Sequence, residues 1–291
     1  MSILVIGGTG TVGSEVVSQL LEKGVDTRVL VRCADKAKSL PIGAKSAVGS
    51  LEEIASLSTA MKGVEGVFVL APLGPRETEM GIMAVRAAQQ AIVRRLVYLS
   101  VFHIEEGRHI PHFASKVPVE VTIQESGIPY TILRPNEFFQ NDRGAIQAVT
   151  EYGLYPSPIG GIGVHRVDVR DIAEAAVNAL TQPGYEGMTY PLVGPEAFTG
   201  KRVAELYSRL LGKQINYAGD DLKAWAHEAG KFIPAEMVED LCVMFEHFQK
   251  EGMLASEEDH KLRDQILGHA PRRFEDFAGE LIDASSSKAG A

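Results

Sequence analysis

Apolar residues at the start of the chain change their spacing across a cluster of glycines. Residues 3–6 are continuously apolar, which predicts a buried parallel strand, and the glycines between Gly7 and Gly13 follow at once. Beyond them, apolar residues recur every three or four positions up to Lys23-Gly24, a typical helix stop. The periodic residues are Val12, Val16, Val17, Leu20 and Leu21. This opening predicts a strand, a tight turn and a helix.

The same alternation of short apolar runs and helical stretches continues to about residue 180. Strands are predicted at 27–31, 66–70, 95–100 and 130–133, and helices at 54–61, 77–91 and 116–125. A helix beginning near 167–171 and a strand at 190–193 complete the series. Alternating strands and helices predict the α/β class, as a doubly wound parallel sheet of the Rossmann type.

From residue 199 onward the pattern becomes mainly amphipathic helix. Helices are predicted at 202–211, 220–229, 235–250 and 257–267. We therefore expect a nucleotide-binding domain at 1–150, with 164–193 returning to it, and a small, mainly helical C-terminal cap at 194–283. The cap would contribute to a substrate pocket over the carboxyl ends of the strands. Residues 284–291 are small and polar and predict a disordered tail.

The glycine cluster, Gly7-Gly8-Thr9-Gly10-Thr11-Val12-Gly13, has the spacing of a dinucleotide-binding turn. In such a turn the first glycine permits the tight bend, the second lets backbone N–H groups approach a pyrophosphate, and the third allows close packing of helix and strand. The phosphates then lie at the helix N-terminus. A plain strand-turn-helix is the alternative, but strand, glycines and helix all fall where the fingerprint requires them.

The end of the second predicted strand indicates which nucleotide is bound. Arg32 stands about where an acidic residue would accept hydrogen bonds from the ribose of NAD, and Lys36 follows one helical turn later. A guanidinium and an ammonium at this point favour the 2′-phosphate of NADP. The alternative is that both are solvated surface cations.

Composition narrows the function classes. The net charge of −9 argues against nucleic acid or an acidic membrane surface as the main partner. Cys33 and Cys242 are far apart and have no second pair of ligands, so we expect neither a disulfide framework nor a metal site. A strand at residue 3 leaves no room for a signal peptide, and no apolar run approaches the length of a membrane span. We expect a cytoplasmic protein.

Residues at the carboxyl ends of parallel strands line the ligand crevice, so candidate site residues are sought there. Ala71 and Pro72 follow one strand and would pass under the nucleotide, whereas Ser100 and Asn136 follow two others and would flank the nicotinamide. His112 and Lys116 lie four residues apart and would share a helix face if the helix begins that early. A histidine can donate a proton near neutral pH. Each of these side chains also has a purely structural alternative, such as a solvated lysine or a strand-end serine that caps the next turn.

Several motifs, taken with the glycine cluster, resemble the NmrA-like family of atypical short-chain dehydrogenases. They are Leu30-Val31-Arg32, Ser100, Lys116 with Glu120, Thr131 to Asn136, Val167 to Ile172, Gly194 to Ala197 and Pro271 to Phe277. The resemblance spans nearly the whole chain. It implies an NAD(P)-binding Rossmann fold with a small C-terminal substrate domain, and NADP bound through Arg32.

The resemblance also implies what the site could do. The family holds NADPH-dependent reductases of quinones, triphenylmethane dyes and plant phenolics, and also regulators that bind a dinucleotide without turning it over. Short-chain dehydrogenases place a Tyr and a Lys four residues apart, where the Tyr is the acid and the Lys holds the nicotinamide ribose. Here His112 stands in the position of that Tyr and Lys116 in that of the Lys.

Two functional hypotheses follow. In the first, NADPH reduces a small aromatic, quinone-like or conjugated carbonyl substrate, with Lys116 on the ribose, Ser100 and Asn136 orienting substrate or nicotinamide, and His112 or water as acid. In the second, the protein senses the NADP or NAD state and changes its affinity for a protein partner. A sugar-nucleotide epimerase ranks third, because it normally needs the Tyr and a larger C-terminal domain. A homodimer is compatible with either hypothesis.

Overall fold

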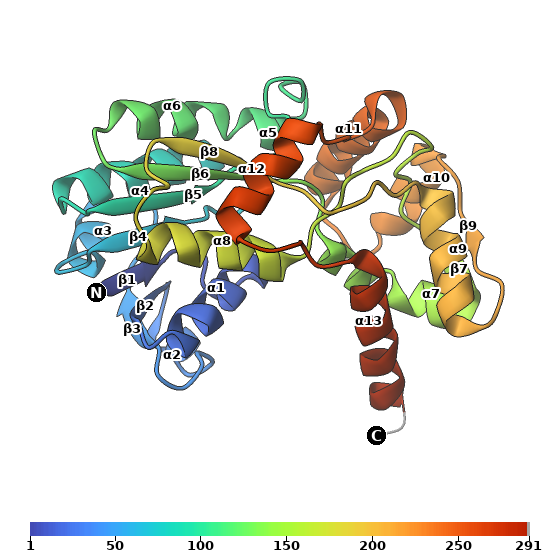
Figure 1. The fold of residues 1–291 in the computed structure, drawn as a ribbon, viewed down its shortest axis with the longest axis horizontal. Coiled ribbons are helices and arrows are strands. Elements are labelled where there is room, and N and C mark those ends of the chain that lie inside the picture. The colour runs from blue at the N-terminus through green and yellow to red at the C-terminus, as the bar shows by residue number, and fades with distance from the viewer. Residues whose placement is uncertain (290–291) are drawn as a thin grey trace. The chain divides into compact units, whose positions relative to one another are not determined.

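The computed structural model describes residues 1–289, and a seven-stranded parallel sheet organises its N-terminal part (Figure 1). The strands are β1 (Ser2–Val5), β2 (Asp26–Val31), β3 (Lys45–Val48), β4 (Gly66–Val69), β5 (Arg95–Leu99), β6 (Tyr130–Pro135) and β8 (Met188–Leu192). Their order is β3-β2-β1-β4-β5-β6-β8, and every neighbouring pair is parallel. The predicted doubly wound parallel sheet is confirmed. The strand order reverses between β1 and β4, and ligands bind at such switch points.

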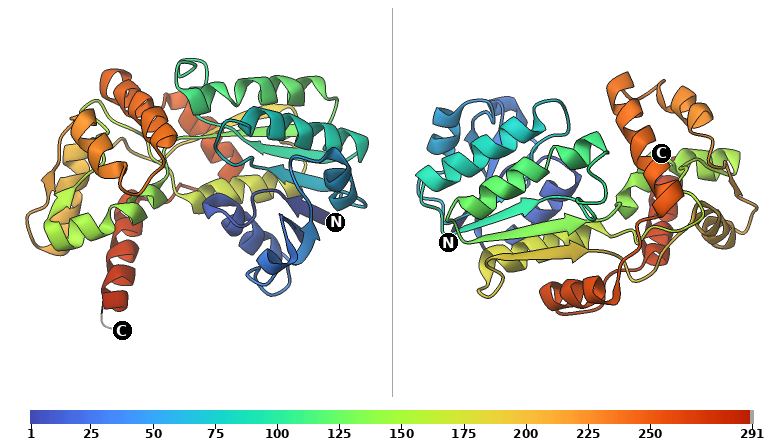
Figure 2. Two further views of the ribbon diagram at one scale, coloured as in Figure 1. Left: turned by 180° about the vertical axis from the view of Figure 1, so that it is seen from behind. Right: turned by 90° about the horizontal axis from the view of Figure 1, so that it is seen from above.

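Helices cover both faces of this sheet (Figure 2). They are α1 (Thr11–Glu22), α2 (Ala34–Ala37), α3 (Ile54–Ala60), α4 (Glu77–Gln90), α5 (Pro111–Ala114), α6 (Val117–Glu125) and α8 (Val169–Thr181). On one face α1 packs against α8, and on the other α4 packs between α3 and α6. An apolar core joins alternate residues of β1, β4 and β5, such as Leu4, Val67 and Leu96, to α4 and α6.

The chain divides into two compact units at positions that differ from the predicted ones. The first unit comprises Met1–Pro135, Val169–Leu192 and Leu262–His269, so its first segment ends at Pro135 rather than at residue 150. The second unit includes Asn136–Asp168 in addition to the predicted cap region. The segment Asn136–Asp168 belongs to the second unit because it pairs with that unit's own residues, for example through Val164 and Phe198. The helix α12 (Glu257–Leu267) begins in the second unit and ends in the first.

The second unit is mainly helical, as predicted. Its elements are the 3₁₀ helix η1 (Phe139–Gly144), α7 (Ile146–Tyr152), α9 (Gly200–Leu211), α10 (Leu222–Ala229), α11 (Ala235–Glu251), α13 (Phe274–Ala289) and the short pair β7 (Leu154–Tyr155) and β9 (Asn216–Tyr217). Its centre is the fully buried Arg166, whose Nη2 donates to Asp142 Oδ1 at 2.7 Å and whose guanidinium lies over the ring of Phe274.

The C-terminus differs from the predicted disordered tail at 284–291. Residues up to Ala289 continue α13, and the last two residues lie outside the described part of the chain. In this part of the helix three serines donate their hydroxyl hydrogens to carbonyl oxygens of the preceding turn, Ser285 and Ser286 to Ile282 and Ser287 to Asp283. Among the described residues, no helix combines the length and the apolar character needed to cross a bilayer.

Candidate functional site

The turn between β1 and α1 depends on glycine at two positions. Gly7 has a φ of 81°, in the left-handed region that disfavours other residues, and a Cβ there would lie 2.8 Å from the carbonyl oxygen of Leu70. A Cβ on Gly13 would lie 2.2 Å from the carbonyl oxygen of Gly7, so only glycine lets α1 pack this closely on the turn. The Gly10 N–H donates to the Gly7 carbonyl at 3.0 Å and closes the turn.

The other side of this turn is open. A Cβ on Gly10 would approach only the Gly7 carbonyl oxygen, at 3.4 Å, and Thr9, Gly10 and Thr11 are all exposed. The first-turn N–H groups of a helix have no partners within the helix, and the helix dipole adds positive potential there. The open glycine cradle at the start of α1 therefore fits a pyrophosphate. Gly8 and Val12 are buried, so they lie on the side of the turn that faces the protein interior.

Two exposed cations follow a strand that pairs with β1. Arg32 directly follows β2, the sheet neighbour of β1, and Lys36 lies in α2. No carboxylate within the described residues pairs with either of them, whereas the nearby Lys38 is bound to Asp35 at 2.8 Å. Two such cations at the end of β2 are suited to bind a phosphate group.

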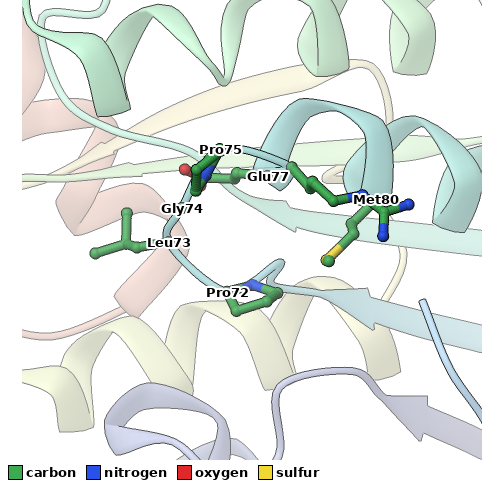
Figure 3. Close-up of a pocket in the computed structure, with 7 residues that line it drawn as sticks. Pro72, Leu73, Gly74, Pro75, Glu77 and Met80 are labelled. Atoms are coloured by element: carbon green, nitrogen blue, oxygen red, sulfur yellow. The ribbon is translucent and has the colours of Figure 1, made fainter. Parts of the chain in front are cut away.

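The loop after β4 flanks the turn on its other side. Ala71 is buried and Pro72 is exposed, and an open hollow extends from Pro72 into the first turn of α4 (Figure 3). The hollow is lined by Pro72, Leu73, Gly74, Pro75, Arg76, Glu77 and Met80. Since β4 is the other neighbour of β1, this loop lies at the switch point of the sheet.

Lys116 lies in the interior and is held by a carboxylate that the sequence did not indicate. Its Nζ donates to Oε1 of Glu77, and the two side chains are only 7% and 1% exposed. The other carboxylate oxygen, Oε2, accepts a hydrogen bond from Ser115 Oγ at 2.8 Å. Glu77 also lines the hollow after β4, so the ion pair lies at the wall of that hollow.

His112 and Lys116 are not on one continuous helix. The first helix, α5, ends at Ala114, and Lys116 is the residue before α6. The break follows from Pro118, which lacks an N–H group and is typical of a first helical turn. His112 is half-buried and its ring meets that of Phe113 edge-on, with centroids 4.8 Å apart.

Ser100, directly after β5, belongs to a chain of polar side chains that runs outward through α6 and β6. Its Oγ donates to Oε1 of the buried Glu120, which also accepts from Nε and Nη2 of Arg134. Arg134 in turn donates to both oxygens of Glu105, each at 3.0 Å. Of these partners, Glu120 and Arg134 fall within motifs of the family resemblance, whereas nothing in the sequence indicated Glu105.

Tyr98 lies on the same face of β5, two residues before Ser100, and its hydroxyl has no hydrogen-bond partner among the described residues. Burial, reinforced by the carboxylates of Glu77 and Glu120, raises the pKa of the phenol well above its ordinary value. The hydroxyl therefore stays protonated at all physiological pH values.

Asn136 is the first residue of the second unit. Its Nδ2 donates to the carbonyl oxygen of Met253 at 2.9 Å, and its Oδ1 accepts from the N–H of Glu137 at 2.8 Å. These bonds fix the segment that follows β6. A role for Asn136 in cofactor binding stays a prediction.

A doubly wound sheet with a glycine turn and a helix N-terminus at its switch point defines a Rossmann-type α/β protein of the dinucleotide-binding class. The family model that describes the NmrA-like family matches residues 1–278. The chain therefore belongs to the NmrA-like family, which confirms the resemblance found in the sequence.

Two curated relatives are similar over most of the chain. An NAD(P)H azoreductase from Xenophilus azovorans is 38% identical over 228 residues, which cover 76% of this chain and 78% of the relative. A (4-alkanoyl-5-oxo-2,5-dihydrofuran-3-yl)methyl phosphate reductase from Streptomyces griseus subsp. griseus is 30% identical over 285 residues, covering 97% and 98% of the two chains.

Solved structures share the fold over nearly the full length. The NADPH-dependent quinone oxidoreductase QOR2 of Escherichia coli superposes with a TM-score of 0.85 at 23% identity and covers 96% of this chain and 99% of its own. The triphenylmethane reductase of Citrobacter sp. superposes with a TM-score of 0.87 at 24% identity and covers 97% and 100%. At these identities the likeness shows the fold alone.

Proposed function

We propose that this protein is an NADPH-dependent reductase that delivers hydride to a small aromatic, quinone-like or conjugated carbonyl substrate. The observation that carries the proposal is the pair of exposed cations, Arg32 and Lys36, to which no described carboxylate is bound, beside an open glycine turn at the switch point of the sheet. The names of the relatives support it. Two of them are reductases that match most of the chain, and one is named for NAD(P)H.

In this proposal, different residues bind the pyrophosphate and the 2′-phosphate of the cofactor. The open N–H groups of the turn from Gly7 to Gly13 and of the first turn of α1 hold the pyrophosphate. Arg32 and Lys36 hold the 2′-phosphate, and Ala71 and Pro72 form the wall on the β4 side. The bound cofactor supplies the hydride, and the protein supplies position and electrostatics.

Lys116 acts in this proposal as a fixed donor rather than as a source of protons. An ammonium group has three hydrogens, of which one is committed to Glu77, so two remain for hydroxyl groups of the nicotinamide ribose. The carboxylate of Glu77 holds the ammonium group in place, so Lys116 positions the ribose. The proton that the reduced substrate needs then comes from His112 or from water.

We also propose a cellular compartment and an oligomeric state for the protein. Both cysteines of the described chain are free thiols and the net charge is −9, which fits a small-molecule enzyme of the reducing cytoplasm rather than a protein that binds nucleic acid or membranes. A homodimer remains part of the proposal and is tested by the mass of the purified protein in solution.

The experiment that tests the function titrates the purified protein with NADPH and with NADH and then screens each complex for cofactor oxidation. The acceptors are a quinone, an azo dye, a cationic triphenylmethane dye and a conjugated carbonyl compound. We expect NADPH to bind more tightly than NADH and to be oxidised when one of these compounds is added. Tight binding without oxidation by any of them would favour the sensing hypothesis, and the absence of binding would refute the assignment of the glycine turn.

A further inference from the structure

The hydroxyl group of Ser100 has a fixed orientation. The N–H of Ser100 donates to the carbonyl oxygen of Leu133 at 2.8 Å, so the residue extends the ladder of β5 and β6 at the carboxyl end of the sheet. Its side chain lies on the face of the sheet that carries Tyr98, toward α6, and the hydroxyl donates to Oε1 of Glu120. A serine hydroxyl has only one hydrogen, and here Glu120 takes it.

Glu120 is the acceptor in this contact, because Arg134 presents donors to both of its carboxylate oxygens. Arg134 donates from Nε to Oε1 at 3.1 Å and from Nη2 to Oε2 at 2.6 Å. Arginine stays protonated in proteins, and an ionised carboxylate can only accept hydrogen bonds. Burial lowers the pKa of Arg134, but the hydrogen bonds and charges of Glu120 and Glu105 outweigh burial and raise it. The hydroxyl hydrogen of Ser100 therefore points toward Glu120 and away from the ligand crevice.

The lone pairs of Ser100 Oγ are left without a partner within residues 1–289. No donor there reaches this atom, although the residue is only 4% exposed and stands at a strand end of the kind that lines the ligand crevice. A buried oxygen with unused accepting capacity favours a ligand that brings an N–H or O–H group. A ligand carbonyl or a developing oxyanion would find no donor in Ser100.

We propose that Ser100 is a specificity residue that accepts a hydrogen bond from an N–H or O–H group of the bound ligand, and that Glu120 and Arg134 hold it in this accepting state. The inference rests on the proposed reductase function and names what its site selects. The donor group belongs either to the carboxamide of the nicotinamide or to the substrate. This role is opposite to that of a serine that donates to the oxygen of a carbonyl substrate.

Glu120→Gln reverses the polarity of Ser100 with little change in shape. Arg134 carries only donors, and its shorter bond, 2.6 Å from Nη2, is to Oε2, so the oxygen of the new glutamine takes that position. The NH₂ group then takes the position of Oε1 and faces Ser100, and the 3.1 Å bond from Arg134 Nε is lost. The serine then accepts from the glutamine, and its own hydrogen points toward the ligand. Ser100→Ala removes the acceptor and leaves the charged chain intact. Glu105→Gln makes the same chemical change at the exposed end of the chain and is the matched control, because Glu120 still binds Arg134.

Two comparisons show whether the donor group belongs to the nicotinamide carboxamide or to the substrate. The first measures the Kd of NADP⁺ and of its acetylpyridine analogue, which keeps the ring carbonyl but lacks the carboxamide N–H. The second measures kcat/KM for an aminonaphthoquinone and for its dimethylamino counterpart with NADPH. In one of the two comparisons the wild type and Glu105→Gln should prefer the compound that carries the N–H by about tenfold, which is the size of one hydrogen bond. Ser100→Ala should abolish this preference, and Glu120→Gln should abolish or invert it.

The outcomes distinguish this inference from the function on which it rests. If NADPH binds and a quinone is reduced, but the wild type shows no preference in either comparison, Ser100 does not select a donor. The same conclusion follows if the preference survives in Ser100→Ala, even where Glu120→Gln fails to fold. If no NADP⁺ binds and no compound is reduced, the proposed function itself is wrong.

Discussion

The Nζ atom of Lys116 donates to Oε1 of Glu77, and this ion pair joins the residue before α6 to the first turn of α4. Both side chains are almost fully removed from water, with 7% and 1% exposed. A buried ion pair recovers the cost of desolvation only while both charges are present. The ion pair therefore links the two helices at the wall of the hollow after β4. Removal of either charge alone would leave the other charge buried without a partner.

The effects of removing the two members of this pair should not be additive. We expect Lys116→Met and Glu77→Gln each to lower the free energy of unfolding, Lys116→Met by about 3–5 kcal/mol because it leaves a buried carboxylate alone. The double variant should lose clearly less than the sum of the two, since the amide that replaces the Glu77 carboxylate can still accept from Ser115. Urea unfolding of the four proteins measures this coupling, and additive losses would contradict it.

The glycine turn gives a prediction that separates folding from cofactor binding. In Gly13→Ala the new Cβ would meet the Gly7 carbonyl oxygen at 2.2 Å, so we expect a loss of about 3 kcal/mol or more in the free energy of unfolding. In Gly10→Ala the nearest atom is 3.4 Å away, and stability should change by less than about 1 kcal/mol. Its Cβ would nevertheless stand on the open side of the turn, where the pyrophosphate must approach.

Thermal melting and titration with NADPH, applied to both variants, test this difference. Gly10→Ala should melt close to the wild type and bind NADPH at least about tenfold more weakly. Wild-type affinity in a stable Gly10→Ala variant would show that the phosphates do not approach the turn from this side.

The sequence was sufficient for those parts of the site that depend on short-range pattern. The apolar run of β1, the glycines and the helical spacing of α1 are consecutive in the chain, so their arrangement follows from local backbone chemistry. The position of Arg32 at the end of β2 was predictable because it adjoins an apolar strand, whereas its role at the nucleotide stays a prediction. The edge strand β3 was missed, because Lys45–Val48 is mostly exposed and has no apolar run.

Partners that are far apart in the chain could not be predicted. Lys116 and Glu77 are 39 residues apart, Ser100 and Glu120 are 20 apart, and no periodicity specifies such pairs. The first pair forms because the topology brings α4 and α6 together on one face of the sheet, and the second because α6 packs on that face beside β5. The expectation that His112 and Lys116 share a helix neglected Pro118, a local signal that was present in the sequence.

Discrimination between the two nicotinamide cofactors should depend on Arg32. Arg32→Ala should raise the Kd for NADPH at least about tenfold and leave that for NADH nearly unchanged, because only NADPH carries the 2′-phosphate. The loss should shrink as salt is added, since the exposed guanidinium is screened. Lys38→Ala is the control, because Lys38 is also exposed near α2 but is bound to Asp35. Equal losses for NADPH and NADH would place Arg32 away from the 2′-phosphate.

Two buried tyrosines should respond in opposite ways to loss of their hydroxyl groups. The hydroxyl of Tyr98 has no partner within the described chain, so Tyr98→Phe should leave the free energy of unfolding at neutral pH unchanged or raise it by about 1 kcal/mol. The hydroxyl of Tyr207 donates to Asp142 Oδ2 at 2.9 Å, so Tyr207→Phe should cost about 1–3 kcal/mol. Urea unfolding at pH 7 compares the two variants.

Alkaline pH provides a separate test of Tyr98, because burial raises the pKa of its phenol well above the ordinary value of 10. The stability that this group contributes is complete below pH 10 and is lost as the pH rises above 10, where the unfolded chain releases the proton and the folded chain retains it. Each such tyrosine lowers the free energy of unfolding by about 1.4 kcal/mol per pH unit in that range. Tyr98→Phe should therefore reduce the slope between about pH 10 and pH 11 by about this amount. An unchanged slope would mean that the phenol of Tyr98 ionises in the folded protein as readily as in the unfolded chain.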